Sequence, residues 1–457
     1  MKKKIALSLV SIGMLTTLNG ADDLSGMFSE GKVSGQIREF SISRSVSDTR
    51  SAKSDYTRDG NAIGGYLKFE TDDFAGLSLG TAFYTTNGFL LDTPNDDYTK
   101  VDPTLLGTNN DSYSLLGEAY LQYKYNKTVF KAGRQKLNTP LAGADDARML
   151  PNLFEAYLMS DSSLSDTNII LAHVTKFAQG TFGRAYTSGV LAATAGYSAV
   201  DSKNQVGKFV NMGSYAIGQE TDGVSVAAIT YTGVKGLKLQ LWDYYAHDIL
   251  NAVYADVSYS WTCLLTDKVK PFAAVQVIKE NDVGDRYLSG LGGDGKIDSL
   301  YYGLKFGFKV ENFTASVAYS KTTENDATDA SYANAIISPW GGMPAYTQGM
   351  VTRHVFLAGT KATKVAASYN FKNLGADLKT VVYYGNYAMD DYNGYTEGDT
   401  SEVGFDFIYN PEAVKNLQLR FRGNFSDDFY VSENNSDNTL NGSVGWDEYR
   451  FIMNYSF

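Results

Sequence analysis

Eighteen segments of about ten residues, in each of which apolar and polar side chains alternate, constrain the fold of this chain more than any other feature. Alternation with a period of two indicates a β-strand with one apolar face. The last segment is the clearest example, because Tyr449, Phe451 and Phe457 alternate with Arg450 and Ser456. We predict strands at 33–42, 62–71, 77–86, 113–125, 128–137, 153–160, 167–175, 224–232, 237–246, 252–262, 269–279, 299–310, 313–321, 363–371, 377–387, 402–409, 417–426 and 447–457.

The connections between these strands alternate between short and long. They are short after the even-numbered strands, as at 126–127 and 311–312. After most odd-numbered strands they are long, and those at 176–223 and 322–362 are the longest; the exception is 247–251. Outer-membrane barrels have this pattern, with short periplasmic turns and long external loops.

The chain is therefore predicted to be all-β, with residues 22–457 forming one transmembrane antiparallel up-and-down β-barrel of 18 strands. Proline supports the assignment, because it cannot donate to a β-ladder and only Pro271 falls inside a predicted strand. The segment 186–218 has some strand character. We interpret it as a folded external loop, and the alternative is two further strands. An even number of strands puts both chain ends on the periplasmic side, where 447–457 can pair with 33–42.

Residues 1–21 have the form of a secretory signal peptide. Three lysines at 2–4 precede an apolar run at 5–18, and small residues then lead to a polar start. The run is too short for a spanning helix, which needs roughly 20 apolar residues. We predict an exported chain that is cleaved after Gly20 or Ala21.

The composition narrows the range of functions. A formal net charge of −11 argues against nucleic acid as a partner. With three histidines and the single Cys263, the chain has few side chains from which to build a metal site or a nucleophilic centre. We therefore predict no catalytic residue, no metal site and no cofactor.

If the apolar face of each strand turns to lipid, residues of the other parity point into the lumen. Strand 417–426 then contributes Arg420 and Arg422, about 7 Å apart along the wall. A guanidinium is a rigid, permanently charged fork that suits a carboxylate. The alternative is that both are polar lumen residues balanced by acidic neighbours such as Asp406. The other basic residues of inward parity are Lys305, Lys309, Lys364, Lys379 and Arg450.

A second region of interest spans 132–159. Taken alone, it is a loop with turn residues and an internal ion pair among Asp145, Asp146 and Arg148. The segment resembles the third-loop signature of the OprD-type (Occ) outer-membrane porins, in which Gly, Thr-Pro, Asp-x-Arg and Pro follow one another. The matching residues are Gly133, Thr139, Pro140, Asp146, Arg148 and Pro151. The Arg-x-Arg strand that contains Arg420 is also similar to that family.

The resemblance implies an 18-stranded barrel whose third loop, at about 138–152, folds into the lumen as a constriction. It also implies a ladder of basic residues that guides small carboxylate-bearing solutes such as amino acids or organic acids. By position, the ladder candidates are Arg420, Arg422, Lys379 and Lys364, and the constriction candidates are Asp146, Arg148 and Asp145. The chain departs from the family at 176–223, where the external loop is unusually long.

We therefore expect an integral protein of the outer membrane of a Gram-negative bacterium that acts as a substrate-selective porin and not as an enzyme. Expected partners are small solutes, outer-membrane lipid and lipopolysaccharide, and the barrel assembly machinery, since Phe457 resembles the C-terminal aromatic which that machinery recognises. Monomer and trimer both remain open. The alternatives are an adhesive or structural barrel, acting through loops with acidic tips at 96–97 and 390–391, and an outer-membrane hydrolase. No serine motif accompanies any of the three histidines.

Overall fold

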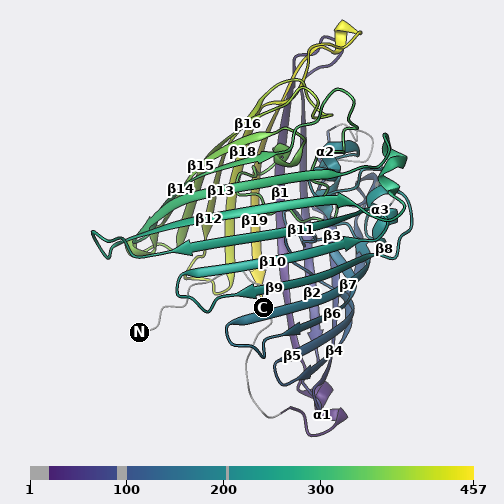
Figure 1. Cartoon of the computed structure of the whole chain (residues 1–457). Helices are drawn as coiled ribbons and strands as arrows, with labels where there is room; N and C mark the ends of the chain where they lie inside the picture. The colour runs from purple at the N-terminus through teal and green to yellow at the C-terminus, as the bar shows by residue number, and fades with distance from the viewer. Residues whose placement is uncertain (1–19, 90–99, 202–204) are drawn as a thin grey trace.

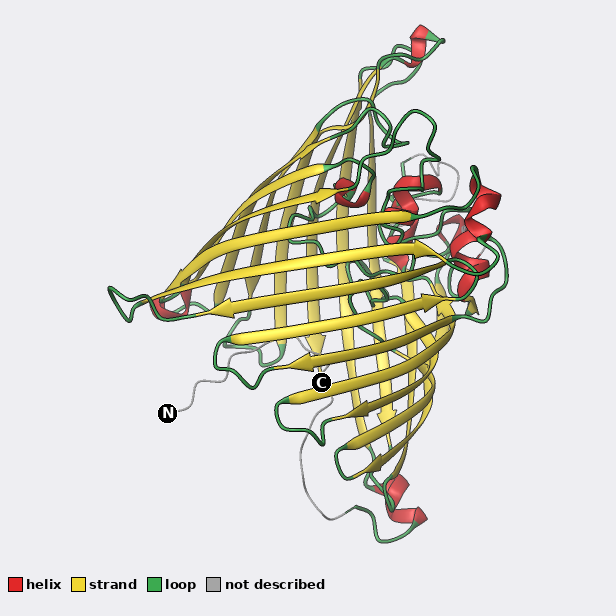
Figure 2. Ribbon diagram, viewed as in Figure 1, coloured by secondary structure: helices red, strands yellow, loops and turns green. Residues whose placement is uncertain are grey.

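The computed structural model describes residues 20–89, 100–201 and 205–457. They form one closed antiparallel sheet, in which the last strand, β19 (Gly442–Ser456), pairs with the first, β1 (Lys32–Asp48). Figures 1 and 2 show the resulting barrel, with short helices confined to its ends and loops. The predicted closure between the first and last strands is confirmed.

Each long strand pairs with its neighbours along the chain. The intervening strands are β2 (Tyr56–Glu70), β3 (Leu77–Gly88), β4 (Tyr113–Tyr125), β5 (Thr128–Gln135), β6 (Leu153–Asp161), β7 (Thr167–Ala178), β8 (Val210–Asn211), β9 (Val224–Tyr231), β10 (Leu237–Ala246), β11 (Leu250–Ser260), β12 (Val269–Asp282), β13 (Asp298–Val310), β14 (Phe313–Thr322), β15 (Lys361–Asn370), β16 (Leu378–Ala388), β17 (Thr400–Tyr409) and β18 (Leu417–Ser432). The α-helices are α1 (Leu24–Ser29), α2 (Gly189–Thr194) and α3 (Met212–Ile217).

The predicted eighteen strands are confirmed, and the described residues add only the two-residue β8. This strand pairs with the end of β7, while β7 itself pairs directly with β9. The segment 186–218 contains α2, β8 and α3, so it is a folded loop and contributes no further long strand to the barrel. Several strands are longer than predicted; for example, β1 continues to Asp48 and β18 continues to Ser432.

Tight turns join the strands at one rim of the barrel. The two-residue turns at 126–127 and 311–312 place Asn126 and Glu311 at positive φ, 53° and 48°. Turns of this kind match the twist of the strands that they connect. At the other rim most connections are long. We number them by order in the chain and refer below to loop 3 (136–152), loop 4 (179–223) and loop 7 (323–360).

Alternation puts the apolar face of each strand on the outside of the barrel. Tyr449 and Phe451 on β19 and Phe457 directly after it are 47%, 43% and 50% exposed. Between them, Arg450 and Ile452 are only 1% and 5% exposed, because they face the interior. The period-two pattern of the sequence is therefore the pattern of outside and inside.

The main cluster of buried apolar side chains lies where loops 4 and 7 meet loop 3 and the inward face of the strands. Trp340 of loop 7 donates from Nε1 to the Met212 carbonyl at 3.2 Å. The Ser338 amide donates to the Ala193 carbonyl at 2.9 Å, and the Gly143 amide of loop 3 donates to the Trp340 carbonyl at 2.9 Å. The three loops therefore pack together as one body.

Two predictions fall outside the described residues: most of the signal peptide, 1–19, and the acidic loop tip at 96–97. In the part of the chain that is described, no helix is both long enough and apolar enough to cross a membrane.

Phe457 completes the seam between β1 and β19. Its amide donates to the Gly35 carbonyl at 3.1 Å, and the Gly35 amide donates to the Phe457 carbonyl at 3.0 Å. Deleting Phe457 removes both hydrogen bonds, each worth roughly 0.5–1.5 kcal/mol. We expect less folded barrel in the membrane, measured as the heat-modifiable band on SDS gels. Phe457→Tyr keeps the backbone and the ring and should assemble normally; equal folded amounts of the deletion and the wild type would contradict this reading.

Candidate functional site

The inward residues of β16 to β19 lie in rows across the wall. Lys379 and Arg420 flank the same residue of β17 and share one row. In the next row the register aligns Asp406 with Arg422 and Arg422 with Arg450. Successive inward residues of a strand lie about 7 Å apart, so the two rows surround Asp406 with cations.

A cavity of about 490 Å³ opens beside the second row. Its charged lining residues are Lys364, Arg353, Arg422, Arg450, Asp145, Asp146 and Asp406. The cavity thus brings together two of the predicted ladder residues and two of the predicted constriction residues. The residues that were predicted for the same site and do not line this cavity are Arg420, Lys379 and Arg148.

Asp406 pairs with both arginines of β18, but more closely with Arg420 than with Arg422. Arg420 donates from Nε to Oδ1 of Asp406 at 2.8 Å and from Nη2 to Oδ2, a two-point contact. Arg422 lies farther away, with Nε 3.6 Å from Oδ2 of Asp406, and among the described residues its Nε has no hydrogen-bond partner. Arg422 is therefore the less closely paired arginine of the two.

Two further cations border the cavity. Lys364 donates from Nζ to the Gln348 carbonyl at 2.5 Å, and Nζ lies 4.1 Å from the ring centre of Tyr383. Arg450 is 3.3 Å from Glu448, measured from Nε to Oε2. Both cations are held in place by the wall and by loop 7, so the cavity has a fixed positive side.

Lys379 has inward parity but lies apart from this cluster. Its side chain is exposed near the first residue of β16, at the rim with the tight turns.

Loop 3 is fixed to the wall through its charged residues. Asp146 accepts from Nη1 of Arg38 at 2.6 Å and also pairs with Lys136 at 3.5 Å. Arg148 is fully buried and pairs with Glu448 at 2.9 Å. Loop 3 therefore contains the predicted internal ion pair, but between Lys136 and Asp146. Arg148 does not take part in it, because the buried Glu448 of the wall offers a fixed counter-charge.

The surroundings of loop 3 shift the pKa values of its ionisable side chains. Burial alone would raise the pKa of Asp146, but the nearby charges of Arg38 and Lys136 outweigh it and hold that pKa below its ordinary value. Burial lowers the pKa of Arg148 to about 10, although the charge of Glu448 acts in the opposite direction. Both groups therefore stay ionised at neutral pH.

Asp145 and Arg353 join loop 3 to loop 7. Arg353 donates from Nη1 and Nη2 to the two oxygens of Asp145 at 2.7 and 3.1 Å, and Tyr197 of loop 4 donates its hydroxyl to the same carboxylate. Burial would lower the pKa of Arg353, but the charge of Asp145 raises it well above its ordinary value. The side chain of Arg353 is 4% exposed, so this is a buried ion pair that involves three loops.

A carboxylate on the wall holds loop 7 from the other side. Glu402 of β17 accepts hydrogen bonds from three consecutive backbone amides, those of Met350, Val351 and Thr352, the last at 2.7 Å. Its fourth donor is the Tyr383 hydroxyl. Loop 7 is therefore held at both the wall and loop 3.

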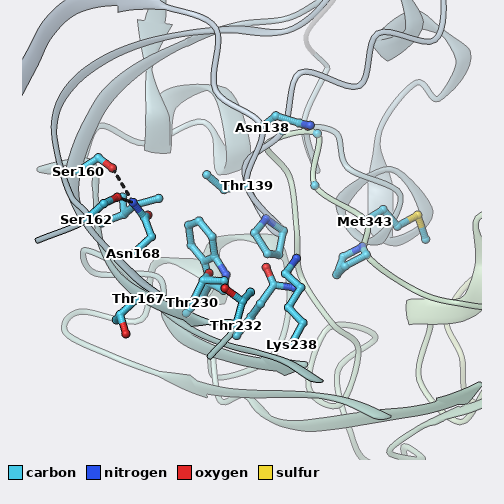
Figure 3. Close-up of a pocket in the computed structure, with 18 of the residues that line it drawn as sticks. Asn138, Thr139, Ser160, Ser162, Thr167, Asn168, Thr230, Thr232, Lys238 and Met343 are labelled. Carbon is cyan, nitrogen blue, oxygen red and sulfur yellow. Dashed lines mark hydrogen bonds between the residues drawn. The ribbon is translucent and has the colours of Figure 1, made fainter. Parts of the chain in front are cut away.

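A second cavity, of about 890 Å³, lies on the other side of this junction (Figure 3). Its wall carries uncharged polar side chains; for example, Asn168 donates to the hydroxyl oxygens of Ser160 and Ser162 at 3.1 and 2.9 Å. The residues that line both cavities are Asp145, Gln348 and Arg353. The loop 3 to loop 7 contact thus separates two cavities, and the larger one also has the charged lining residues Lys127, Asp166 and Lys238.

Several residues of the site were not predicted as such. The residues missed are Arg38, Arg353, Glu402 and Glu448, and Arg450 was recognised only as inward-facing. Arg38 and Glu448 share the inward parity of their strands, which was a usable signal. Arg353 lies in a loop without periodicity, so nothing in the sequence pointed to it.

A closed barrel with inward loops and a basic wall can be compared with known families. The model of the OprD family of outer-membrane porins matches residues 25–457. The chain belongs to the OprD family of outer-membrane porins. It is therefore an integral outer-membrane porin of a Gram-negative bacterium, and its family and fold are those of a channel for small solutes. No curated protein gives a significant match.

Solved structures of similar fold come from Pseudomonas aeruginosa. OccK9 (OpdG) is 18% identical with a TM-score of 0.71, and the alignment covers 94% of this porin and 99% of that chain. OpdK, solved with vanillate, is 16% identical with a TM-score of 0.70, covering 94% and 100%. OpdO is 18% identical with a TM-score of 0.68, covering 95% and 98%. At these identities the comparisons show a shared fold.

The Asp145–Arg353 pair allows a direct test of the loop junction. Arg353→Gln leaves a buried carboxylate without its cation, which typically costs about 3–5 kcal/mol. We expect loops 3 and 7 to separate, giving larger and noisier single-channel currents in planar bilayers and faster proteolysis of loop 7.

The double variant Asp145→Asn with Arg353→Gln is the matched control, because it removes both charges and leaves none unpaired. It should behave more like the wild type than Arg353→Gln does. If the single and double variants give the same currents, the pair does not hold the junction.

Proposed function

We propose that this porin selects small solutes that carry a carboxylate and lets them diffuse passively through its lumen. The observation that supports this most is the charged cavity, in which Arg422, Lys364 and Arg450 form a fixed positive side and Arg422 is only loosely paired with Asp406. An excess of one sign of charge along one side of a narrow lumen concentrates ions of the opposite sign there.

The two rows of the wall provide a path for the anion. Lys379 and Arg420 share the row nearer the rim of tight turns, and Arg422 lies in the next row. A carboxylate that leaves Arg422 meets another cation about 7 Å away, which is within reach of a small solute. We propose these residues, with Lys364, as the basic ladder.

We propose that loop 3 narrows the pathway and fixes its width. Asp145 and Asp146 contribute acidic groups opposite the basic wall of the cavity. Arg148 does not line the cavity, and we assign it to anchoring loop 3 on Glu448. A solute with an ammonium group as well as a carboxylate, such as an amino acid, can then interact with both sides.

Other properties of the porin are part of the same proposal. OpdK, a structural neighbour, was solved with vanillate, an organic anion, which is compatible with a carboxylate as solute here. We propose contact with outer-membrane lipid and lipopolysaccharide around the wall, and recognition of Phe457 by the barrel assembly machinery. Diffusion needs no catalytic residue, so we expect no enzymatic activity.

Replacing Arg422 and Lys364 by Gln tests the basic wall. Because both cations face the cavity, we expect a loss of anion selectivity and a drop of about tenfold in carboxylate uptake at low salt, within the range for electrostatic focusing. The measurements are the reversal potential in planar bilayers and liposome swelling with amino acids, dicarboxylates and sugars. Sugar uptake should change little.

Lys321→Gln is the matched control, because Lys321 has outward parity on β14 and pairs with Glu324. It removes one positive charge outside the lumen, where the double variant removes two inside it, and should leave selectivity unchanged. At about 1 M salt, where the screening length is about 3 Å, wild type and double variant should converge. An unchanged reversal potential in the double variant at low salt would refute the basic-wall proposal.

A further inference from the structure

The charged residues that line the cavity of about 890 Å³ lie at its two ends. Lys127 in a tight turn, Asp166 just before β7 and Lys238 at the start of β10 lie at the rim of tight turns. Asp145 and Arg353 lie at the junction of the loops, where they neutralise each other across 2.7 Å. Among the described residues, those that line the wall between these two ends are uncharged. This part of the lumen therefore has little means of holding an ion.

Hydrogen-bonding side chains follow one another across the wall between the two ends. The register aligns Asn168 on β7 with Thr230 on β9, and Thr230 with Gln240 on β10. Asn168 donates from Nδ2 to Ser160 and Ser162, which lie beside it in Figure 3. All five residues line the cavity, and we call them the uncharged strip.

The uncharged strip offers both hydrogen-bond donors and acceptors. Ser160 and Ser162 accept from Asn168, and each keeps its own hydroxyl proton to donate. Gln240 donates from Nε2 to Oδ1 of Asp256 at 3.4 Å, and its side-chain carbonyl oxygen can accept. A hydroxyl group of a solute both donates and accepts, so it suits such a set. A carboxylate forms its strongest hydrogen bonds with charged donors, which lie elsewhere in the lumen.

Carbon-rich groups complete the cavity. Trp242 follows Gln240 among the inward residues of β10, about 7 Å farther along the strand. Its ring stacks on that of Tyr244, with the ring centres 6.0 Å apart, and is fixed in the wall. Pro140 of loop 3 and Pro344 of loop 7 line the side that the loops form. The carbon skeleton of a solute can pack against these groups while its hydroxyl groups bond to the uncharged strip.

We propose that this cavity binds the hydroxyl-bearing part of a solute, and that the solutes of this porin are polyhydroxylated carboxylates such as sugar acids. The inference rests on the proposed function, because the basic wall of the charged cavity is taken to bind the carboxylate. The two cavities share Asp145, Gln348 and Arg353, so a solute can meet both on its way through the lumen. The uncharged strip then distinguishes one carboxylate from another, which the basic wall alone does not do.

Gluconate and hexanoate test this site, because they have carbon chains of the same length and the same charge, and only gluconate carries hydroxyl groups along its chain. In planar bilayers, gluconate should interrupt the single-channel current of the wild type with the higher apparent affinity. Asn168→Leu with Thr230→Val removes hydrogen-bonding groups at nearly constant side-chain size. We expect this double variant to lower the gluconate affinity about fivefold, as for the loss of about one net hydrogen bond. The hexanoate affinity should change little.

Thr363→Val with Asn386→Leu is the matched control. Thr363 and Asn386 are also cross-strand partners, on β15 and β16, and both have outward parity. The control makes the same two chemical changes outside the lumen and should leave both affinities unchanged. Ser160→Ala with Ser162→Ala is a second variant, which introduces only smaller side chains and should also weaken gluconate binding. Heat-modifiable mobility checks the fold of each variant.

Sorbitol, which has hydroxyl groups and no carboxylate, separates this inference from the proposed function. Equal affinities of gluconate and hexanoate for the wild type, both above that of sorbitol, would overturn the hydroxyl site and leave the selection of carboxylates in place. A preference for gluconate that survives in both lumen variants would also overturn it. If sorbitol binds as well as gluconate and is weakened by Asn168→Leu with Thr230→Val, the hydroxyl site stands and the carboxylate proposal fails.

Discussion

Backbone hydrogen bonding is the constraint on which this structure depends. In the hydrocarbon of a membrane an unpaired amide or carbonyl costs several kcal/mol, so a sheet can span it only when no edge is left open. Here β1 and β19 meet that requirement through a continuous register from Gln36 and Ser456 to Asp48 and Val444. Once the sheet is closed, the alternation along every strand separates lipid from lumen. The interior then becomes the place where charged side chains can be kept away from lipid.

The interior is far from an empty pore. Arg148, Glu448 and Arg450 are almost fully buried, and such charges are tolerated only when each finds a counter-charge. Loop 3 supplies Arg148 to Glu448, and the wall supplies Arg44 and Arg450 to the same carboxylate. Loops 3, 4 and 7 are held as one body by the Asp145–Arg353 pair and by apolar packing. Arg422 is less completely paired, because its Nε has no hydrogen-bond partner among the described residues. A binding site for an anion is expected where pairing is incomplete.

The sequence was sufficient for those features that repeat with a period of two. It predicted the strands, their parity and the inward position of Arg420 and Arg422, because alternation encodes which side a residue faces. It did not predict the outer ends of β1 and β18, since alternation of apolar residues fades where strands leave the lipid and outward positions become serine or aspartate. Nor did it predict Arg353, because its pairing with Asp145 joins residues far apart in the chain and depends on how two aperiodic loops pack.

Asp406 illustrates why a passage for anions needs acids beside its cations. A row of arginines with no acid would repel one another and would hold a carboxylate too firmly to release it, whereas conduction requires binding weak enough to leave. Because Asp406 already engages Arg420 at two points and Arg422 only at 3.6 Å, a solute carboxylate entering the row competes with a resident one. Each step along the wall is then an exchange between similar partners, with a small change in free energy. On the proposed function, the acids of the lumen set the rate of passage as much as the arginines set its selectivity.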